Sequence, residues 1–451
     1  MIAPVVAGDR YRAIGQRQIT TLPEWQRLSP DLREAVDVVS RVLPFRTNAY
    51  VLGLVDWDSV PVDPIFHLTF PQHDMLAPEE YRRIADLIAS GAPAPEVRGA
   101  ADLIRLRLNP HPAGQLTHNV PELDGRKLDG LQHKYRETVL YFPSQGQTCH
   151  AYCTYCFRWA QFVGMPGLKF EAREPSDLVA YLRRHQEVTD VLVTGGDPMI
   201  MKTATLRKHF EPLLEAELDH VQTLRIGTKS LAYWPARFVT DADADDLLRL
   251  FERMIAAGRH VAVMAHFSHD RELGTGLVRE AIRRIRDTGA EIRMQAPLIR
   301  GVNDDPQVWT RLWREGVRLG MIPYYMFVER DTGPKGYFEV PLGRAYQIFR
   351  DAYQRVSGLA RTVRGPSMSA HPGKVRVLGV QRLGEEKVFL LDFLQARNPI
   401  WVRRPFFAKF DARATWFDQL RPAFGERNYF FDGVRERSER ERAALALQAA
   451  G

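Results

Sequence analysis

Cys149-His-Ala-Tyr-Cys153-Thr-Tyr-Cys156 contains all three cysteines of this 451-residue chain. Three thiolates at this spacing can each ligate one iron of a cubane iron–sulfur cluster, which leaves the fourth iron without a protein ligand. That iron would be free to bind a small molecule. Two other interpretations are three buried cysteines without a ligand, and a zinc site that uses His150 as its fourth ligand. The absence of any other cysteine from the chain favours the cluster.

An aromatic residue, Phe157, follows the last cysteine. The Cys-x3-Cys-x2-Cys spacing with this aromatic residue closely resembles the motif of radical S-adenosylmethionine (SAM) enzymes. The resemblance implies a 4Fe–4S cluster on Cys149, Cys153 and Cys156, with SAM at the open iron. Because an open cluster is easily oxidised, we expect a reducing, cytoplasmic compartment.

The composition excludes several classes of protein. A hydrophobic content of 45% and a charged content of 26% are typical of a globular protein with a large core. The net charge of +7 is scattered over the chain, which predicts no nucleic-acid partner. No apolar run reaches the roughly 18 residues needed to span a bilayer, and the N-terminus lacks the signal-peptide pattern, so we expect no membrane partner.

Short β-rich runs alternate with amphipathic helical stretches from Thr138 onward. The runs are Thr138–Phe142, Asp190–Thr194, Leu224–Thr228, His260–Ala265, Glu291–Pro297 and Met321–Val328. The helix candidates are Pro175–Gln186, Thr205–Ala216, Ala242–Ala257, Gly274–Thr288 and Pro306–Leu319. This alternation predicts an α/β fold of parallel βα units. Six units are too few for a closed eight-stranded barrel, so we expect a partial (β/α)6 barrel with its chemistry at the C-terminal ends of the strands.

Three regions are expected along the chain. Residues 1–130 form a helical N-terminal lead-in, 131–340 the partial barrel, and 341–451 a C-terminal extension. In the lead-in we expect helices at Leu22–Leu43 and Pro78–Ser90, a proline-rich break at 61–71 and a loop-rich segment at Pro93–Gly114. In the extension we expect a helix from Pro341 to Leu359, a turn-rich segment at Arg361–Lys374, a hairpin of Val375–Leu378 with Lys387–Leu391, and a surface-wrapping tail that ends in a solvated helix at Arg435–Arg442.

Gly195-Gly196-Asp197 ends the second β-rich run. Glycines let a ligand approach the backbone closely, although such a sequence is equally common in a tight turn. One run after the cysteine motif, the segment resembles the glycine-rich segment with which radical SAM enzymes hold the amino group of SAM. The resemblance implies that these three residues bind SAM.

Further segments, between about Pro61 and Lys374, indicate which family of radical SAM enzymes the chain resembles. They are His133–Leu140, Leu224–Lys229, His266–His269, Gln295–Asp304 and Pro323–Val328. In this order they resemble the lysine 2,3-aminomutase family, which uses pyridoxal phosphate (PLP) in addition to the cluster and SAM. The resemblance also implies a cofactor-binding role for Gln295.

The PLP lysine of that family follows a glycine-rich turn, and the match here is Ser369-Ala-His-Pro-Gly373-Lys374. The resemblance implies that Lys374 forms a Schiff base with PLP, although the run of glycines is reduced to His-Pro-Gly. A surface lysine that opens a hairpin is the alternative. Lys134 and Tyr135 match the positions that hold the PLP phosphate. Thr138 stands where a second phosphate-binding arginine is usual, so that anchor is missing or moved.

Arg158 matches the arginine that pairs with the substrate α-carboxylate, a role that suits a planar guanidinium. Lysine-using members place two aspartates around the far end of the substrate, and this sequence aligns Arg330 and Ser367 there. An arginine would repel a lysine ammonium. We therefore expect a substrate with an acidic or neutral polar side chain, unless the alignment shifts by one residue onto Glu329 or Asp331.

The expected activity is that of an isomerase, an amino-acid 2,3-aminomutase that moves the α-amino group to the β-carbon through a 5′-deoxyadenosyl radical. The partners would be an amino-acid substrate and a flavodoxin- or ferredoxin-like electron donor; a homo-oligomer is among the states left open. A second hypothesis, favoured by the altered PLP turn, is a radical SAM lyase, desaturase or protein-side-chain-modifying enzyme. A non-enzymatic iron–sulfur carrier is the third and needs neither the glycine-rich turn nor the barrel.

Overall fold

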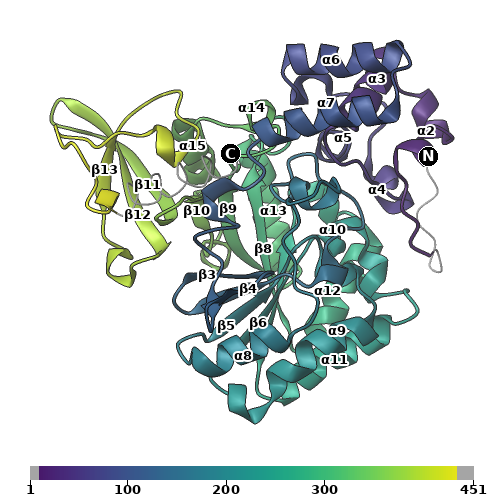
Figure 1. Cartoon of the computed structure of the whole chain (residues 1–451). Coiled ribbons are helices and arrows are strands. Elements are labelled where there is room, and N and C mark those ends of the chain that lie inside the picture. Colours follow the sequence, from purple (N-terminus) through teal and green to yellow (C-terminus); the bar gives the residue numbers. More distant parts are fainter. Residues whose placement is uncertain (1–9, 434–451) are drawn as a thin grey trace.

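The computed structural model describes residues 10–433, and one eleven-stranded sheet runs through it in the order β13-β12-β11-β10-β9-β8-β7-β6-β5-β4-β3 (Figure 1). Six consecutive strands at its centre are parallel. They are β4 (Thr138–Tyr141), β5 (Asp190–Val193), β6 (Thr223–Thr228), β7 (His260–His266), β8 (Glu291–Leu298) and β9 (Ile322–Val328). All six expected runs are therefore strands, and the α/β fold class is confirmed.

Each parallel strand from β5 onward is preceded by a helix, as expected. The helices are α8 (Ser176–Arg184), α9 (Thr203–Phe210), α11 (Ala244–Ala256), α12 (Gly276–Asp287) and α13 (Pro306–Arg318). In α12 the buried residues are Val278, Ala281, Ile282 and Ile285, the spacing of one helical face. This face packs against β8, as α11 packs against β7 and α13 against β9.

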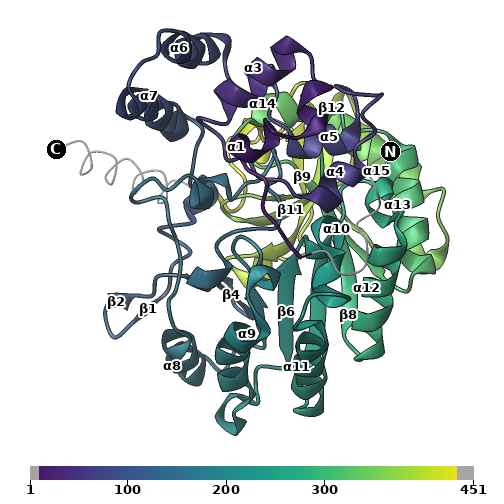
Figure 2. The ribbon, with the colours of Figure 1, turned by 90° about the vertical axis from the view of Figure 1, so that its right-hand side faces the viewer.

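The N-terminal region is helical and lies beyond the ends of the strands, not beside an edge strand of the sheet (Figures 1 and 2). Its helices are α1 (Gln16–Ile19), α2 (Pro23–Gln26), α3 (Pro30–Val39), α4 (Ala49–Leu54), α5 (Pro64–Thr69), α6 (Pro78–Ala89) and α7 (Ala94–Arg107). The helix at 78–90 is confirmed, whereas the stretch Leu22–Leu43 is split because Pro30 begins a new helix. Within residues 10–433 no helix is both long and apolar enough to cross a bilayer.

Two expectations for this region are wrong. The proline-rich stretch 61–71 contains α5, and the segment expected to be loop-rich, Pro93–Gly114, is mostly α7. Both helices have proline in the first turn. Proline is favoured there because its missing N–H has no partner in a helix in any case, so these prolines begin helices instead of breaking them.

Strands continue the sheet on both sides of the parallel core. On one side is β3 (Leu131–Tyr135), and on the other are β10 (Arg364–Ser369), β11 (Gly373–Leu383), β12 (Glu386–Ala396) and β13 (Phe406–Lys409). The hairpin is confirmed as β11 and β12, longer than expected, and the helix after Pro341 is α15 (Leu342–Tyr353). The turn-rich interpretation of Arg361–Lys374 is wrong because β10 pairs with β9 and β11.

The two ends of the sheet approach each other, since β12 contacts β3. Side chains bridge them. Lys134 Nζ on β3 donates to Ala370 O, and the Arg397 guanidinium, just after β12, donates to Asn119 Oδ1 at 2.6 Å and His118 O at 3.4 Å. The C-terminal region therefore closes the gap beside the parallel strands.

The chain after β12 packs into a second hydrophobic core that it shares with β9 to β12, so the expectation of a surface-wrapping tail is wrong for residues 398–433. The buried aromatic residues of this stretch include Trp401, Phe406, Phe417 and Phe431. The helix expected at Arg435–Arg442 lies outside the described residues. The expected boundary between residues 340 and 341 falls between β9 and β10, which are neighbours in one sheet.

Asp63 joins the N-terminal helices to the segment that follows β7. Its carboxylate is buried, accepts a hydrogen bond from Phe66 N at 2.8 Å and pairs with Arg271 in the segment after β7. We predict that Asp63→Ala lowers the free energy of unfolding by about 2–4 kcal/mol, because it removes a helix cap and leaves the guanidinium unpaired. Urea denaturation measures this change.

The matched control is Asp58→Ala. Asp58 pairs with Arg27 but its side chain is 90% exposed, so a change of about 0.5 kcal/mol or less is expected. Equal stability of the two variants would contradict the role assigned to Asp63.

Candidate active site

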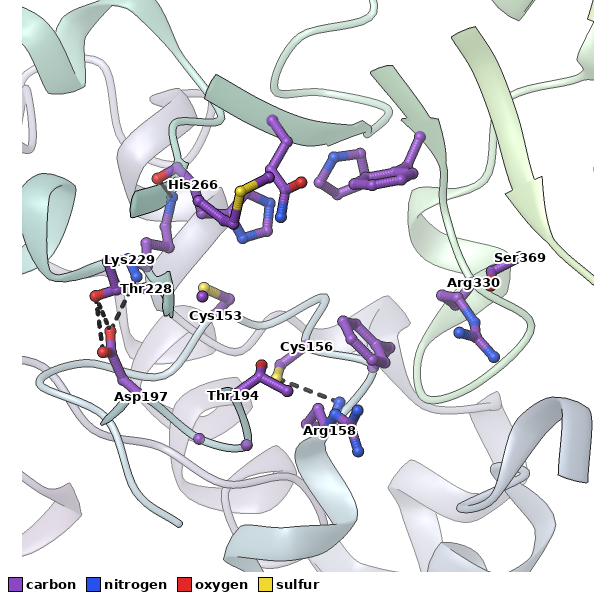
Figure 3. Close-up of a pocket in the computed structure, with 18 of the residues that line it drawn as sticks. Cys153, Cys156, Arg158, Thr194, Asp197, Thr228, Lys229, His266, Arg330 and Ser369 are labelled. Atoms are coloured by element: carbon purple, nitrogen blue, oxygen red, sulfur yellow. Dashed lines mark hydrogen bonds between the residues drawn. The ribbon is translucent and has the colours of Figure 1, made fainter. Parts of the chain in front are cut away.

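One cavity of about 320 Å³ lies at the C-terminal ends of the parallel strands, where the sequence placed the chemistry (Figure 3). Every expected site residue lines it. These residues are Lys134, Tyr135, Cys149, Cys153, Cys156, Arg158, Gly195, Gly196, Asp197, Gln295, Arg330, Ser367 and Lys374. They come from seven different segments of the chain, which the fold brings together around one cavity. Their individual roles stay predictions.

The loop after β4 carries the cysteines, and the N-terminal helices hold it. Tyr152 N donates to Arg46 O at 2.8 Å, and Thr154 donates from its backbone to Leu68 O at 3.0 Å and from its hydroxyl to His67 O at 2.6 Å. The three thiols are free and half-buried. Burial raises the pKa of each thiol, so a bound cation is needed to stabilise the thiolates.

The donor arrangement fits a cluster better than a zinc ion. Within residues 10–433 no three His, Cys, Asp or Glu side chains lie close enough together to hold one ion, as a tetrahedral zinc site requires. His150, the possible fourth ligand, is 3% exposed and its Nδ1 shares a hydrogen bond of 2.9 Å with Ser230 Oγ. A cubane cluster needs each thiolate on a separate iron, which suits three thiols spread along one cavity wall.

The glycines after β5 are needed for close packing. A Cβ at Gly195, whose φ is +139°, would lie 2.1 Å from the Gln147 amide nitrogen. A Cβ at Gly196 would lie 2.5 Å from Thr148 N. Both contacts fall just before Cys149, so this turn fits against the start of the cysteine loop while it lines the cavity.

The Asp197 carboxylate is 2% exposed and surrounded by donors. It accepts hydrogen bonds from Thr228 Oγ1 at 2.7 and 2.9 Å, and from Lys229 N and Ser230 Oγ at 2.9 and 3.0 Å. Met199 N donates to it at 2.9 Å. The structure thus gives the side chain a positioning role between the β5 and β6 loops, and its expected contact with SAM stays a prediction.

Lys374 opens β11, but its side chain lines the cavity and not the outer surface. Its Nζ lies 4.2 Å from the centre of the Tyr325 ring. Burial lowers the pKa of Lys374 to about 8. At pH 7 about one tenth of an amine with this pKa is unprotonated, far more than in an exposed lysine. The unprotonated amine is the form that attacks a carbonyl carbon.

Cations gather beside Lys374. Burial is the main cause that lowers the pKa of Lys134 well below its usual value, followed by the charges of Arg397, Arg330 and Lys374. Buried like charges are costly unless an anion joins them, so this end of the cavity fits a phosphate. Thr138 takes no part, because its hydroxyl donates to Asp190 Oδ2 at 3.1 Å.

Arg158 is 7% exposed, and its Nε and Nη1 have no hydrogen-bond partner. Its guanidinium lies 4.1 Å from the centre of the Phe142 ring. Burial, and next the charge of Arg330, lower the pKa of Arg158 to about 9. A buried guanidinium with unused donors fits a carboxylate, which it can bind through two parallel hydrogen bonds.

Arg330 is only partly satisfied. Its Nη2 donates to Pro112 O at 3.5 Å, its Nε makes no hydrogen bond, and Asp331 Oδ1 is 4.0 Å away. Arg330 and Arg158 both flank the Phe157 ring, at 5.4 and 5.2 Å from its centre. Glu329 lines the cavity as well, and burial raises its pKa well above the usual range, which favours the neutral carboxyl form. Asp331 does not line the cavity.

The segment 108–120 contributes to the cavity wall, and no motif in the sequence indicated it. Gly333 N donates to Leu108 O at 2.8 Å, and Arg397 holds Asn119 at the other end. The segment brings Gln115 and Asn119 to the cavity wall. No local pattern marks Arg397 or Gln115, because their contacts join residues far apart in the chain.

A cysteine loop at the end of a parallel strand, a glycine-rich turn after the next strand and one shared cavity define the radical SAM class. Comparison with known proteins narrows the class. A putative L-lysine 2,3-aminomutase from Aquifex aeolicus is 31% identical over 410 residues, which cover 91% of this chain and 96% of that protein. The chain belongs to the L-lysine 2,3-aminomutase family.

Other relatives are more distant. The L-lysine 2,3-aminomutase of Bacillus subtilis is 22% identical over 76% of this chain and 63% of that protein. The glutamate 2,3-aminomutase of Clostridioides difficile is 25% identical over 76% of this chain and 69% of that protein. A scan against protein-family models found no match. Among solved structures, a radical SAM methyltransferase from Sphaerobacter thermophilus is 19% identical, covers 63% of this chain and 93% of that chain, and has a TM-score of 0.37.

Asp197→Ala tests the positioning role of this carboxylate. Removing it leaves buried donors without an acceptor, so we predict a loss of about 2–4 kcal/mol in the free energy of unfolding and a reduced iron content after reconstitution. Asp197→Asn keeps one acceptor oxygen and is expected to retain more of both. If Asp197→Ala kept full stability and full iron content but bound SAM weakly, the carboxylate would be a SAM ligand and not a positioning group.

Proposed function

We propose that the chain is a radical SAM, PLP-dependent 2,3-aminomutase, an isomerase that moves the α-amino group of an L-amino acid to its β-carbon. The observation that carries this proposal is that the three cysteines, Arg158 and Lys374 line one cavity. The cysteine loop supplies the radical-generating end and Lys374 the amine-holding end. A substrate in the same space could reach both.

Each cofactor has residues that could hold it. Cys149, Cys153 and Cys156 would hold the 4Fe–4S cluster, and the Gly195–Asp197 turn and Gln295 would contact SAM. Lys374, Lys134 and Tyr135 would hold PLP. When bound, these groups supply the one-electron cleavage chemistry and the electron sink, while the protein supplies orientation and exclusion of water.

The protein's own contribution begins with Arg158. Its free Nε and Nη1 donors would bind the substrate α-carboxylate and so fix the α- and β-carbons relative to the cavity walls. Because burial lowers the pKa of Lys374 to about 8, a larger share of this amine is neutral and able to bond to PLP than in an exposed lysine. The segment 108–120 adds Gln115 and Asn119 to the wall of the site.

The substrate side chain would face Arg330 and Ser367. Arg330 has an unpaired Nε, and the buried Ser367 hydroxyl has no hydrogen-bond partner. Burial raises the pKa of Glu329 well above its usual range, which weakens its ability to cancel the charge of Arg330. This set of donors supports an acidic or neutral polar side chain over a cationic one. A relative named for glutamate is consistent with such a substrate.

Attachment of PLP is the first test. Reduction with borohydride followed by peptide mapping should find the pyridoxyl group on Lys374, and Lys374→Ala should abolish it, whereas exposed Lys127→Ala should not. Because the pKa of Lys374 is lowered to about 8, the rate of attachment should fall about tenfold per pH unit below that value as the amine protonates. Label on another lysine would refute the assignment. A protein that binds the 4Fe–4S cluster but no PLP would favour the alternative, a radical SAM lyase, desaturase or protein-side-chain-modifying enzyme.

Substrate choice is the second test. The reconstituted enzyme, incubated with each common amino acid, should form β-amino products from acidic or neutral polar substrates and not from lysine. Arg330→Gln should lower kcat/KM for an acidic substrate by about 10- to 100-fold, because it removes a charge-assisted hydrogen bond. The exposed Arg136→Gln is the matched control and should leave this ratio unchanged. Efficient turnover of lysine by the wild type would show that Arg330 does not set the specificity.

A further inference from the structure

The sulfur of Cys153 has surroundings that the other two cysteines lack. Its Sγ lies 3.5 Å from the hydroxyl oxygen of Tyr233, which is 1% exposed. The thiol donates in this contact. A sulfur bound to iron is deprotonated and can only accept, so the Tyr233 hydroxyl would then become the donor. Tyr155 provides a second phenol near the same sulfur.

The ammonium group of Lys229 lies close to the Tyr233 ring. Lys229 Nζ lies 4.5 Å from the centre of the Tyr233 ring, and its side chain is 9% exposed (Figure 3). The ammonium donates to Glu272 Oε1 at 2.8 Å, Ser268 Oγ at 3.2 Å and His266 O at 3.3 Å. With all three hydrogens used, the ammonium cannot move away from the cysteine loop.

The negative partner of Lys229 is turned toward other donors. Glu272 is fully buried, and its Oε2 accepts hydrogen bonds from Ser268 N at 2.5 Å and His269 N at 3.2 Å. These backbone donors offset part of the negative charge of Glu272, and among the charges that act on the pKa of Cys153, that of Lys229 outweighs that of Glu272. The positive end of the pair is the one that lines the cavity.

The other two sulfurs have no phenol contact of this kind within residues 10–433. Cys156 Sγ accepts one backbone hydrogen bond, from Arg158 N at 3.4 Å. Burial raises the pKa of Cys149 and Cys156, and the charges of Arg46 and Arg158 offset part of that rise. In the described part of the chain, the hydroxyl of Tyr233 backed by the Lys229 ammonium is therefore what distinguishes Cys153 from the other two cysteines.

We propose that Tyr233 and Lys229 are tuning residues that raise the reduction potential of the cluster through Cys153. The proposal rests on the proposed function, because it requires a 4Fe–4S cluster on the three cysteines. In the step concerned, a low-potential one-electron donor passes one electron to the cluster, which goes from the 2+ to the 1+ state; no bond forms or breaks and no proton moves. The added electron makes the cluster more negative, so a hydrogen bond to its sulfur and a nearby cation stabilise the reduced state.

The test is a redox titration of the anaerobically reconstituted full-length protein, with dithionite as reductant and the EPR signal of the reduced cluster as readout. Tyr233→Phe removes one hydroxyl and keeps the ring, and Lys229→Met removes the charge. Both should shift the midpoint potential to more negative values at unchanged iron content. Lys229→Arg should restore most of the wild-type value. Because Lys229→Met leaves Glu272 unpaired and could fail to fold, Tyr233→Phe keeps the proposal testable.

Tyr141→Phe is the matched control. Tyr141 is a buried tyrosine on β4, but its hydroxyl bonds to His209 Nδ1 at 2.8 Å and not to a cysteine sulfur, so its removal should leave the potential unchanged. If Tyr233→Phe titrates at the wild-type potential, or if Tyr141→Phe shifts it equally, the tuning role is overturned while the proposed function stands. A wild-type protein that holds no cluster overturns both.

Discussion

The position of the cysteine loop depends on the buried carboxylate of Asp197. Its oxygens collect donors from the start of the segment after β6, and its backbone N–H donates to Gly146 O and Thr148 O at 3.0 and 2.8 Å, just before Cys149. Ser230 then links the carboxylate to His150 inside the cysteine loop. One buried side chain thus joins three loops at the ends of β4, β5 and β6. A shift in any of them would move the thiols relative to the cavity.

The opposite side of the cavity depends on residues distant in the chain. Arg397, beyond the last strand of the hairpin, holds Asn119 and the backbone of His371, and Lys134 on β3 reaches Ala370. These contacts draw the two ends of the sheet together around Lys374. The C-terminal extension is therefore part of the site, and its aromatic core provides the rigid support that a positioned lysine needs.

Local patterns in the sequence predicted the parts of the fold that local patterns determine. The six parallel strands and their helices follow from short apolar runs and amphipathic spacing, and the thirteen candidate site residues were found from motifs and resemblance. The strand β10 was missed because Arg364-Gly-Pro-Ser lacks a strand pattern and is extended only because β9 and β11 pair with it. Arg397 and the segment 108–120 were missed for a similar reason, since tertiary contacts alone bring them to the cavity. The prolines of α5 and α7 led to a wrong prediction of non-helical structure. Proline disrupts the interior of a helix but is favoured in its first turn, where both helices have it.

The central claim is that radical generation and amine migration share one cavity. Deuterium transfer tests it most directly. A substrate amino acid labelled with deuterium at its β-carbon is incubated with reduced, cluster-loaded, PLP-loaded enzyme and SAM, and the 5′-deoxyadenosine and the amino-acid product are analysed by mass spectrometry. The account predicts deuterium in the 5′-deoxyadenosine together with a β-amino product. Cleavage of SAM without any deuterium transfer from any amino acid would contradict it.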